Sequence, residues 1–245
     1  MKSKLPEVTL LFWIMKIAAT TLGETAGDLL SMTLKIGYAV SSMILIGLFL
    51  VTVVTQLKSK EYHPLLFWTV IVSTSTAGTT MSDYMDRTLG LGYAKGTLIL
   101  VTILAVIFVY WRYSDHSFSV QNIRTFKAEL LYWIAILFSN TLGTALGDFL
   151  ADSSGLGFTG GALLIGILLT LTVLANYFTQ FSKTLLFWIA FVLTRPFGAT
   201  MGDVLTKSKE KGGLAFGTIG SSLVLGSIVG ILILYTTLNQ NKDNV

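Results

Sequence analysis

The chain has 245 residues, of which 53% are hydrophobic and 12% are charged, whereas a soluble domain usually carries about 25% charged residues. Its formal net charge of +4 comes from basic residues scattered over short loops, which argues against a nucleic acid as a partner. The chain contains no Cys and its two His lie in polar connecting segments, so thiolate and imidazole metal sites inside a membrane are not expected. This composition predicts an integral membrane protein of the all-α class, in contact with the lipid bilayer.

Eight transmembrane helices are predicted, each close to the roughly 20 apolar residues that cross a bilayer. In chain order they cover about residues 10–32, 38–57, 65–85, 93–112, 128–150, 158–178, 184–206 and 214–237. The basic start followed by an apolar run could pass for a secretory signal. Because this run already belongs to the repeated pattern described next, we expect it to be retained.

One pattern occurs four times: an aromatic pair ending in Trp, a Gly ten residues later, a small residue four further on, and an Asp next to it. The copies are Phe12-Trp13…Gly23…Gly27-Asp28, Phe67-Trp68…Gly78…Ser82-Asp83, Tyr132-Trp133…Gly143…Gly147-Asp148 and Phe187-Trp188…Gly198…Gly202-Asp203. Successive Trp residues are 55, 65 and 55 positions apart, which indicates a pair of repeats that was duplicated once more.

Each repeat is expected to form a helical hairpin, so that the chain is one transmembrane domain over 1–245 with halves 1–120 and 121–245. The repeats cover about residues 8–60, 63–118, 128–181 and 183–238. An even number of spans gives all four the same orientation, so they can be pseudo-symmetric about the membrane normal, with their first helices around the axis. Nine Lys or Arg on the side of the termini, against six on the other, predict cytoplasmic termini.

Small residues at a spacing of four predict that the first helices pack closely, since three copies read Gly-x-x-x-Gly and the second reads Gly78-x-x-x-Ser82. The Trp that opens each repeat is interpreted as an anchor in an aromatic belt at one membrane face.

A polar stripe runs along the same helices at positions i, i+4 and i+8, which share a helix face. A carboxylate inside a membrane costs about 2.5–3.5 kcal/mol on insertion scales, so these positions are functional candidates. The alternative is that each Asp reaches water at a helix end, or caps a new segment after a break at the glycines. The stripe reads Thr20-Glu24-Asp28, Ser75-Thr79-Asp83, Asn140-Thr144-Asp148 and Arg195-Ala199-Asp203.

Within the first helices five acids stand against two bases, Lys16 and Arg195, so a cation or protons are expected to balance three negative charges. Oxygen ligands without Cys or His are typical of sites for Mg²⁺, Ca²⁺ or Mn²⁺. Met81 and Met201 could favour Mn²⁺, or simply fill space. The predicted metal ligands are Glu24, Asp28, Asp83, Asp148, Asp203, Thr20, Thr79, Asn140 and Thr144.

Two bases and a proline depart from the fourfold pattern near this site. Lys16 lies eight residues before Glu24 and Arg195 eight before Asp203, so each base can share a face with an acid and act in gating or charge balance. A static ion pair is the alternative. Pro196 is expected to kink its helix.

The tandem Trp-x9-Gly-x3-small-Asp units resemble a family of bacterial inner-membrane proteins built from four two-helix repeats, long of unknown function. The resemblance covers almost the whole chain and implies the fold and the bacterial inner (plasma) membrane as location, but no substrate. The segment from Thr20 to Asp28 is also similar to the Glu- and Asp-containing helix motifs of several cation exporters, some of which handle Mn²⁺.

These features predict a secondary transporter, an exporter of a divalent cation with Mn²⁺ favoured, which has no cofactor and is not an enzyme. One alternative is a proton-coupled carrier or channel for a small organic solute, with the carboxylates relaying protons and Arg195 holding an anionic group. Another is a membrane scaffold or sensor whose polar seam specifies assembly. Protons are a further expected partner, and a homo-oligomer is compatible with the sequence.

Overall fold

The computed structural model describes residues 4–114, 123 and 125–243. This part of the chain contains eight α-helices and no strand. The helices are α1 (Leu10–Asp28), α2 (Tyr38–Lys58), α3 (Pro64–Asp83), α4 (Tyr93–Ser114), α5 (Phe126–Asp148), α6 (Gly157–Phe178), α7 (Lys183–Thr206) and α8 (Thr218–Asp243).

All eight predicted helices are present, and most of their ends lie within a few residues of the predicted ones. None of the first helices breaks at its glycines. In α1, α3 and α5 the chain continues beyond the Asp into a π-helical turn, η1 (Leu29–Thr33), η2 (Tyr84–Thr88) and η4 (Phe149–Ser153). The Asp residues before these turns have helical backbone angles and make no capping hydrogen bond, so the capping alternative is wrong for these three repeats.

Among the described residues, six helices are long and apolar enough to cross a membrane: α2, α4, α5 with its π turn, α6, α7 and α8. These helices are consistent with a multi-pass membrane protein. The remaining two, α1 and α3, carry runs of Thr and Ser that lower their hydropathy, and these polar residues lie in the interior of the bundle.

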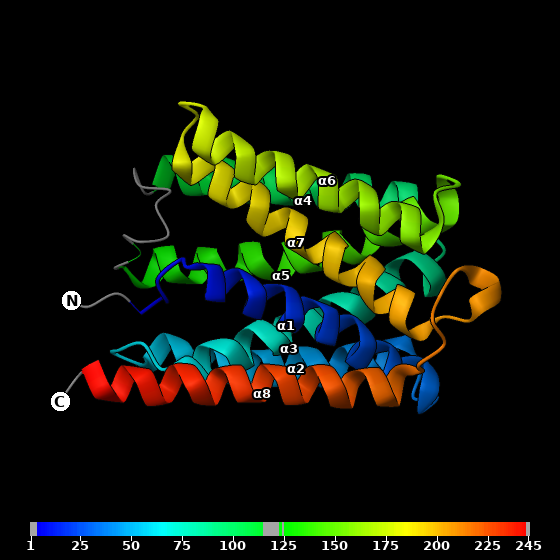
Figure 1. The fold of residues 1–245 in the computed structure, drawn as a ribbon, viewed down its shortest axis with the longest axis horizontal. Helices are drawn as coiled ribbons and strands as arrows, with labels where there is room; N and C mark the ends of the chain where they lie inside the picture. The colour runs from blue at the N-terminus through cyan, green and yellow to red at the C-terminus, as the bar shows by residue number, and fades with distance from the viewer. Residues whose placement is uncertain (1–3, 115–122, 124, 244–245) are drawn as a thin grey trace.

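The first helices of the repeats form an inner ring in which α1 packs against α3, α3 against α5, α5 against α7 and α7 against α1. The second helices lie outside this ring (Figure 1). Helix α8 runs alongside α1, the helix on which α7 packs to close the ring. Helix α1 begins and α8 ends at the same end of the bundle (Figure 1). The ring agrees with the expected arrangement of the first helices around one axis.

Each second helix packs mainly against the first helix of the next repeat rather than against the first helix of its own repeat. Helix α2 lies on α3, α4 on α5, α6 on α7, and α8 on α1. The connection in the first repeat contains a π turn and Gly37 with a φ of +84°, which carry the chain past its own first helix. The outer helices therefore link the repeats to one another.

The glycine seam is confirmed. Each first helix places a glycine against the polar stripe of the neighbouring helix, so closely that a Cβ atom there would overlap it. The pairs follow the ring: Gly23 against Ser75, Gly78 against Asn140, Gly143 against Arg195 and Pro196, and Gly198 against Thr20.

Aromatic side chains close one end of the inner ring. The aromatic residue before each Trp contacts the Trp of the next repeat, with ring centroids 5.6 to 6.1 Å apart. Trp68, Trp133 and Trp188 are buried, whereas Trp13 is half-buried. The interpretation as lipid-facing anchors is wrong for the three buried Trp, because their helix face turns into the ring. The contacts are Phe12 with Trp68, Phe67 with Trp133, Tyr132 with Trp188, and Phe187 with Trp13.

Candidate functional site

The polar stripes of the four first helices all lie in the interior of the inner ring. Every one of the twelve stripe residues is at most 3% exposed, so the structure brings all nine predicted ligands into one region. They are stacked in layers, because four residues along a helix span about 6 Å. A single ion therefore cannot contact all nine predicted ligands.

The middle layer is centred on an ion pair between two helices. The Nη2 atom of Arg195 in α7 lies 3.0 Å from Glu24 Oε2 in α1 and 2.7 Å from the hydroxyl oxygen of Thr144 in α5. It also donates to the hydroxyl of Thr79 in α3, and Nη1 donates to the Thr20 carbonyl at 3.3 Å. Each of the four first helices thus contributes to this network.

Glu24 is the acceptor on which this network converges. The hydroxyls of Thr79 and Thr144 each lie 3.2 Å from its Oε2 atom, the same atom that meets Arg195. Arg195 is thus paired with Glu24 on the adjacent helix α1 rather than with Asp203, which lies two turns away on its own helix. In the next layer toward the aromatic end, the Asn140 amide donates to the hydroxyls of Thr74 and Ser75 at 3.0 and 3.4 Å.

Lys16 lies in an apolar layer between this network and the aromatic end of the ring. Its side chain is fully buried, and its Nζ atom is 4.0 Å from the ring centroid of Phe191 in α7. Among the described residues this Nζ has no hydrogen-bond partner. The equivalent positions of the second and third repeats hold Ile71 and Ile136, both fully buried. The structure therefore does not pair Lys16 with Glu24.

At the other end of the stripes, two bases bridge the four repeated Asp residues. Arg87, in the π turn after α3, places Nε 2.9 Å from Asp83 Oδ1 and Nη2 3.0 Å from Asp148 Oδ2. Lys207, directly after α7, lies 2.8 Å from Asp28 Oδ2 and 3.1 Å from Asp203 Oδ1. Each base thus joins the Asp of its own repeat to the Asp of the next repeat around the ring. We call this arrangement of four Asp and two bases the acidic ring.

Arg87 and Lys207 are the residues that the sequence analysis missed. They are 120 positions apart, the same offset that relates the two halves, and each follows its repeated Asp by four residues. That spacing is the signal that could have found them, since side chains at i and i+4 meet on one helix face. They also correct the charge balance, because the five acids now face four bases and a single negative charge remains in surplus.

Three buried carboxylates come together on one side of the acidic ring. One oxygen each from Glu24, Asp28 and Asp203 lies within 4.8 Å of the other two. Hard divalent cations bind oxygen ligands at about 2.0–2.6 Å, so ligands on opposite sides of an ion are about 4–5 Å apart. The donor set and its spacing therefore fit such a cation. Burial lowers the pKa of Lys207, but the neighbouring Asp203 and Asp28 carboxylates raise it above its usual range overall, so Lys207 stays charged.

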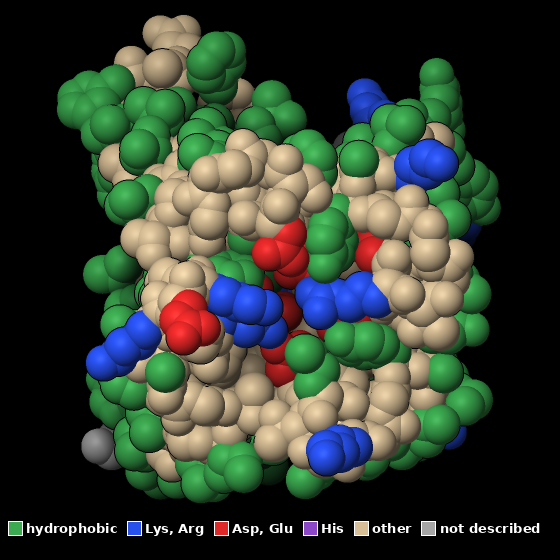
Figure 2. All heavy atoms as spheres, turned by 90° about the vertical axis from the view of Figure 1, so that its right-hand side faces the viewer, with side chains coloured by type: hydrophobic (Ala, Val, Ile, Leu, Met, Phe, Trp, Pro, Cys, Tyr) green, Lys and Arg blue, Asp and Glu red, His purple; other side chains and the backbone are tan. Residues whose placement is uncertain are grey.

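The acidic ring is reachable from its end of the bundle. The side chains of Arg87 and Lys207 are 30% and 20% exposed, whereas the Asp side chains beneath them are at most 4% exposed. Figure 2 looks onto this end and shows acidic side chains recessed near the centre of the face, next to basic ones. Two basic side chains thus separate the buried carboxylates from solvent.

Comparisons with known proteins bear on the repeats. A family model described as Repeat of Unknown Function (DUF347) matches four tandem stretches, residues 11–62, 66–117, 131–182 and 186–241. No curated protein and no solved structure matched the chain. The four matched stretches confirm the predicted repeats and cover most of the sequence. The chain therefore belongs to the family whose members carry this repeat of unknown function.

Proposed function

We propose that the protein is a secondary transporter, an exporter of a divalent cation with Mn²⁺ favoured, and that Glu24, Asp28 and Asp203 bind the ion. The observation that supports this most is the approach of these three buried carboxylates to within 4.8 Å. Three anionic oxygens in the interior of a helical bundle require positive charge, and Lys207 supplies it here through two of them.

Lys207 acts as an internal substitute for the ion in this proposal. Its Nζ atom bridges Asp28 and Asp203, while its side chain keeps 20% exposure and can turn toward solvent when an ion enters. The formal charges favour a divalent ion. With Lys207 in place, five acids face four bases. When Lys207 turns away, three bases remain, so two negative charges are uncompensated and one divalent cation balances them.

The other predicted ligands take supporting roles. Thr79 and Thr144 hydrogen-bond to Glu24 Oε2 and hold that carboxylate in place, together with Arg195. Thr20 and Asn140 belong to the layer above and position neighbouring backbone and hydroxyl groups. On the other side of the ring, Asp83, Asp148 and Arg87 are equivalent to Asp203, Asp28 and Lys207. Thr144 stands there at the position equivalent to Glu24, so that side offers a cation one carboxylate fewer.

The two ends of the ring support alternating access, in which a transporter opens to one side at a time. Toward the aromatic end, the buried side chains of Ile71, Ile136 and Phe191 and the aromatic contacts separate the carboxylates from solvent. Toward the acidic end, the partly exposed side chains of Arg87 and Lys207 lie between the carboxylates and solvent. Helix α7 continues through Pro196, whose missing hydrogen bond is a natural place for bending.

We further propose that all eight helices span the bacterial inner membrane, pseudo-symmetric about its normal, with cytoplasmic termini. In this orientation the aromatic end, where α1 begins, faces the cytoplasm and the acidic end faces outward. An exporter in an outward-open state would present its site as the acidic ring does. The polar helices α1 and α3 can cross because their polar faces are covered by the other first helices.

Flux measurements in proteoliposomes test this proposal. We expect the wild type to carry one or a few divalent cations from a panel, and Asp28→Asn or Asp203→Asn to reduce that flux at least tenfold. Asp152→Asn, at an exposed acid one turn beyond the ring, is the matched control and should behave as wild type. Undiminished flux in both ring variants would overturn the assignment. Flux of an organic solute that ignores metals would support the alternative carrier instead.

A further inference from the structure

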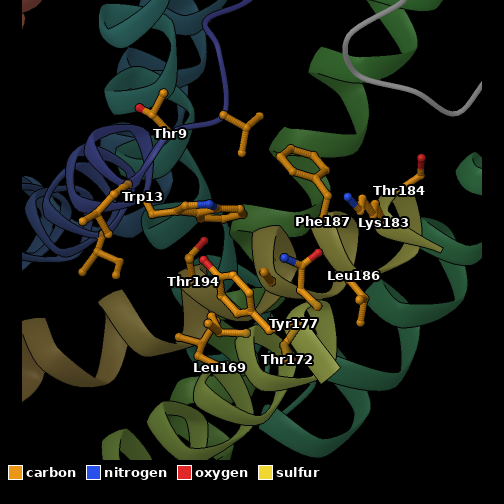
Figure 3. Close-up of a pocket in the computed structure, with 16 residues that line it drawn as sticks. Thr9, Trp13, Leu169, Thr172, Tyr177, Lys183, Thr184, Leu186, Phe187 and Thr194 are labelled. Atoms are coloured by element: carbon orange, nitrogen blue, oxygen red, sulfur yellow. The ribbon is translucent and has the colours of Figure 1, made fainter. Parts of the chain in front are cut away.

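A lateral groove lies between the N-terminal halves of α1 and α7 and the C-terminal half of α6. Its volume is about 570 Å³, within the range of about 300–1,000 Å³ that is common for ligand sites. Figure 3 shows the rings of Trp13, Phe187 and Tyr177 around this space, with Lys183 and Thr184 at its edge. The groove lies at the aromatic end and is separate from the acidic ring.

At the groove, the third repeat carries two smaller side chains where the second repeat has two aromatic ones. In α4, Phe108 and Trp111 lie against Trp188, with ring centroids 5.1 and 5.6 Å apart. The equivalent residues of α6, 65 positions later, are Val173 and Asn176. Trp13 of α1 takes the place beside α6 that Trp188 of α7 takes beside α4, and Trp13 lines the groove.

Burial at the equivalent positions sets α6 apart from both α4 and α2. Trp111 in α4 and Gln56 in α2 are fully buried, whereas Asn176 is exposed. Val53 in α2 is 5% exposed, whereas Val173 is 52% exposed. In the C-terminal half of α6, Val173 and Asn176 are therefore left uncovered beside the groove, and a matching molecule could fill the space that aromatic side chains take in α4.

We propose that this groove binds one anionic phospholipid. An acyl chain would lie along Leu169, Val173 and Phe187, where a bilayer offers hydrocarbon to any apolar surface left open. Lys183 at the edge supplies a positive charge for the phosphate, and no acidic side chain is among the described residues that line the groove. Basic pockets between membrane helices on the cytoplasmic side are typical sites for anionic headgroups.

The inference uses the membrane orientation of the proposed function but not the cation site. Lys183 lies at the first residue of α7, at the aromatic end that we place in the cytoplasm, where anionic lipids are concentrated. Lipid binding can be measured without any metal. A protein that failed to transport cations could therefore still bind the lipid, and the two failures are distinguishable.

The test compares lipids that remain bound to the full-length protein in detergent by native mass spectrometry, after addition of phosphatidylglycerol or phosphatidylcholine. We expect one retained phosphatidylglycerol per chain, and a larger rise in melting temperature with this lipid than with phosphatidylcholine. Lys183→Gln should reduce the preference for phosphatidylglycerol at least fivefold. Lys95→Gln, an exposed lysine at the opposite end, is the control and should keep it.

A second variant fills the groove with the side chains of the second repeat, Val173→Phe together with Asn176→Trp. We expect this protein to retain no lipid there and to melt, in lipid-free detergent, no lower than the wild type. Equal retention of both lipids by wild type and Lys183→Gln, or unchanged lipid binding in a folded groove-filling variant, would overturn the proposal. If that variant does not fold, the comparison of the two lipids on wild type and Lys183→Gln decides alone.

Discussion

The two ends of the inner ring are made from the same repeat, but they differ in what joins neighbouring helices. At the aromatic end, each repeat touches the next through an aromatic pair, and three of the four Trp residues are buried. At the acidic end, two of the four pairs of neighbouring repeats share a base, Arg87 or Lys207, between two carboxylates. One end is held by the packing of aromatic rings, whereas the other is held by charges that solvent can reach.

The two ends of each repeat therefore have different roles. Packing contacts are made wherever the fourfold pattern is kept, so the aromatic end provides stability and closure. Residues that break the pattern, Glu24 and Arg195, lie between the ends and meet each other directly at 3.0 Å. Variants at the two ends should therefore separate effects on stability from effects on cation binding.

The largest loss of stability is expected from Arg195→Met. This change leaves the Glu24 carboxylate buried without its charged partner, which costs about 3–5 kcal/mol of unfolding free energy. Denaturant unfolding in detergent measures it. The double variant Arg195→Met with Glu24→Gln should recover a large part of the loss, and equal losses in both would show that the ion pair is not the cause.

Removing an aromatic side chain from the closed end comes next. Trp133→Ala deletes a fully buried indole that contacts Phe67 and Tyr132, and we expect a loss of about 3 kcal/mol. Trp13→Ala is the matched control from the first repeat, where the side chain is half-buried and the loss should be clearly smaller. Equal losses would mean that the closed end is not held by packing of the buried rings.

A methyl group added at the seam should cost less. Gly143→Ala would overlap the side chain of Arg195 and the nitrogen of Pro196, so we expect a loss of about 1–3 kcal/mol. Gly226→Ala in α8 has open space around it and should be neutral or slightly stabilising, because Ala favours a helix. If Gly143→Ala does not lower the free energy of unfolding, α5 and α7 do not approach each other this closely.

At the acidic end, Lys207→Gln is expected to act mainly on cation binding, because Lys207 bridges Asp28 and Asp203, the two Asp residues of the proposed site. Without the internal competitor, the Kd for the divalent cation should fall about tenfold, or about 1.4 kcal/mol. Arg87→Gln is the control from the other half of the ring. A Kd that rises in Lys207→Gln would mean that Lys207 assists the ion rather than replaces it.

The smallest effect on stability is expected from Lys16→Met. The ammonium lies in a layer with Ile71, Ile136 and Phe191 and has no hydrogen-bond partner among the described residues. An apolar side chain of similar length should leave the melting temperature unchanged or raise it. A drop of more than a few degrees would show that the contact with the Phe191 ring stabilises the fold.

Much of the fold could be predicted because it depends on local signals. Apolar length placed the eight helices, and the four-residue spacing of small residues predicted that the first helices pack closely, as they do where Gly143 meets Arg195. The packing of α2 on α3 was not predictable in this way, since either neighbour can cover an apolar helix face. The Trp positions were misread because a ring of aromatic residues at a membrane face and one inside a bundle have the same spacing.

The candidate site was predicted in part. The stripe positions are all buried together, as helix periodicity requires. The pairing of Arg195 with Glu24 between α7 and α1 could not be derived, because it depends on which first helices are neighbours around the axis. Arg87 and Lys207 lie just beyond the apolar segments, so a count limited to the first helices left them out and overstated the negative charge.

The most direct test of the central claim is equilibrium binding of Mn²⁺ to the purified protein by isothermal titration calorimetry, comparing Asp203→Asn with Asp83→Asn. These two Asp residues are equivalent positions of the two halves, but only Asp203 lies with Glu24 and Asp28. We predict one binding site in the wild type that Asp203→Asn removes and Asp83→Asn largely retains. Equal loss in both variants, or binding that survives in Asp203→Asn, would contradict the assignment of the cation to these three carboxylates.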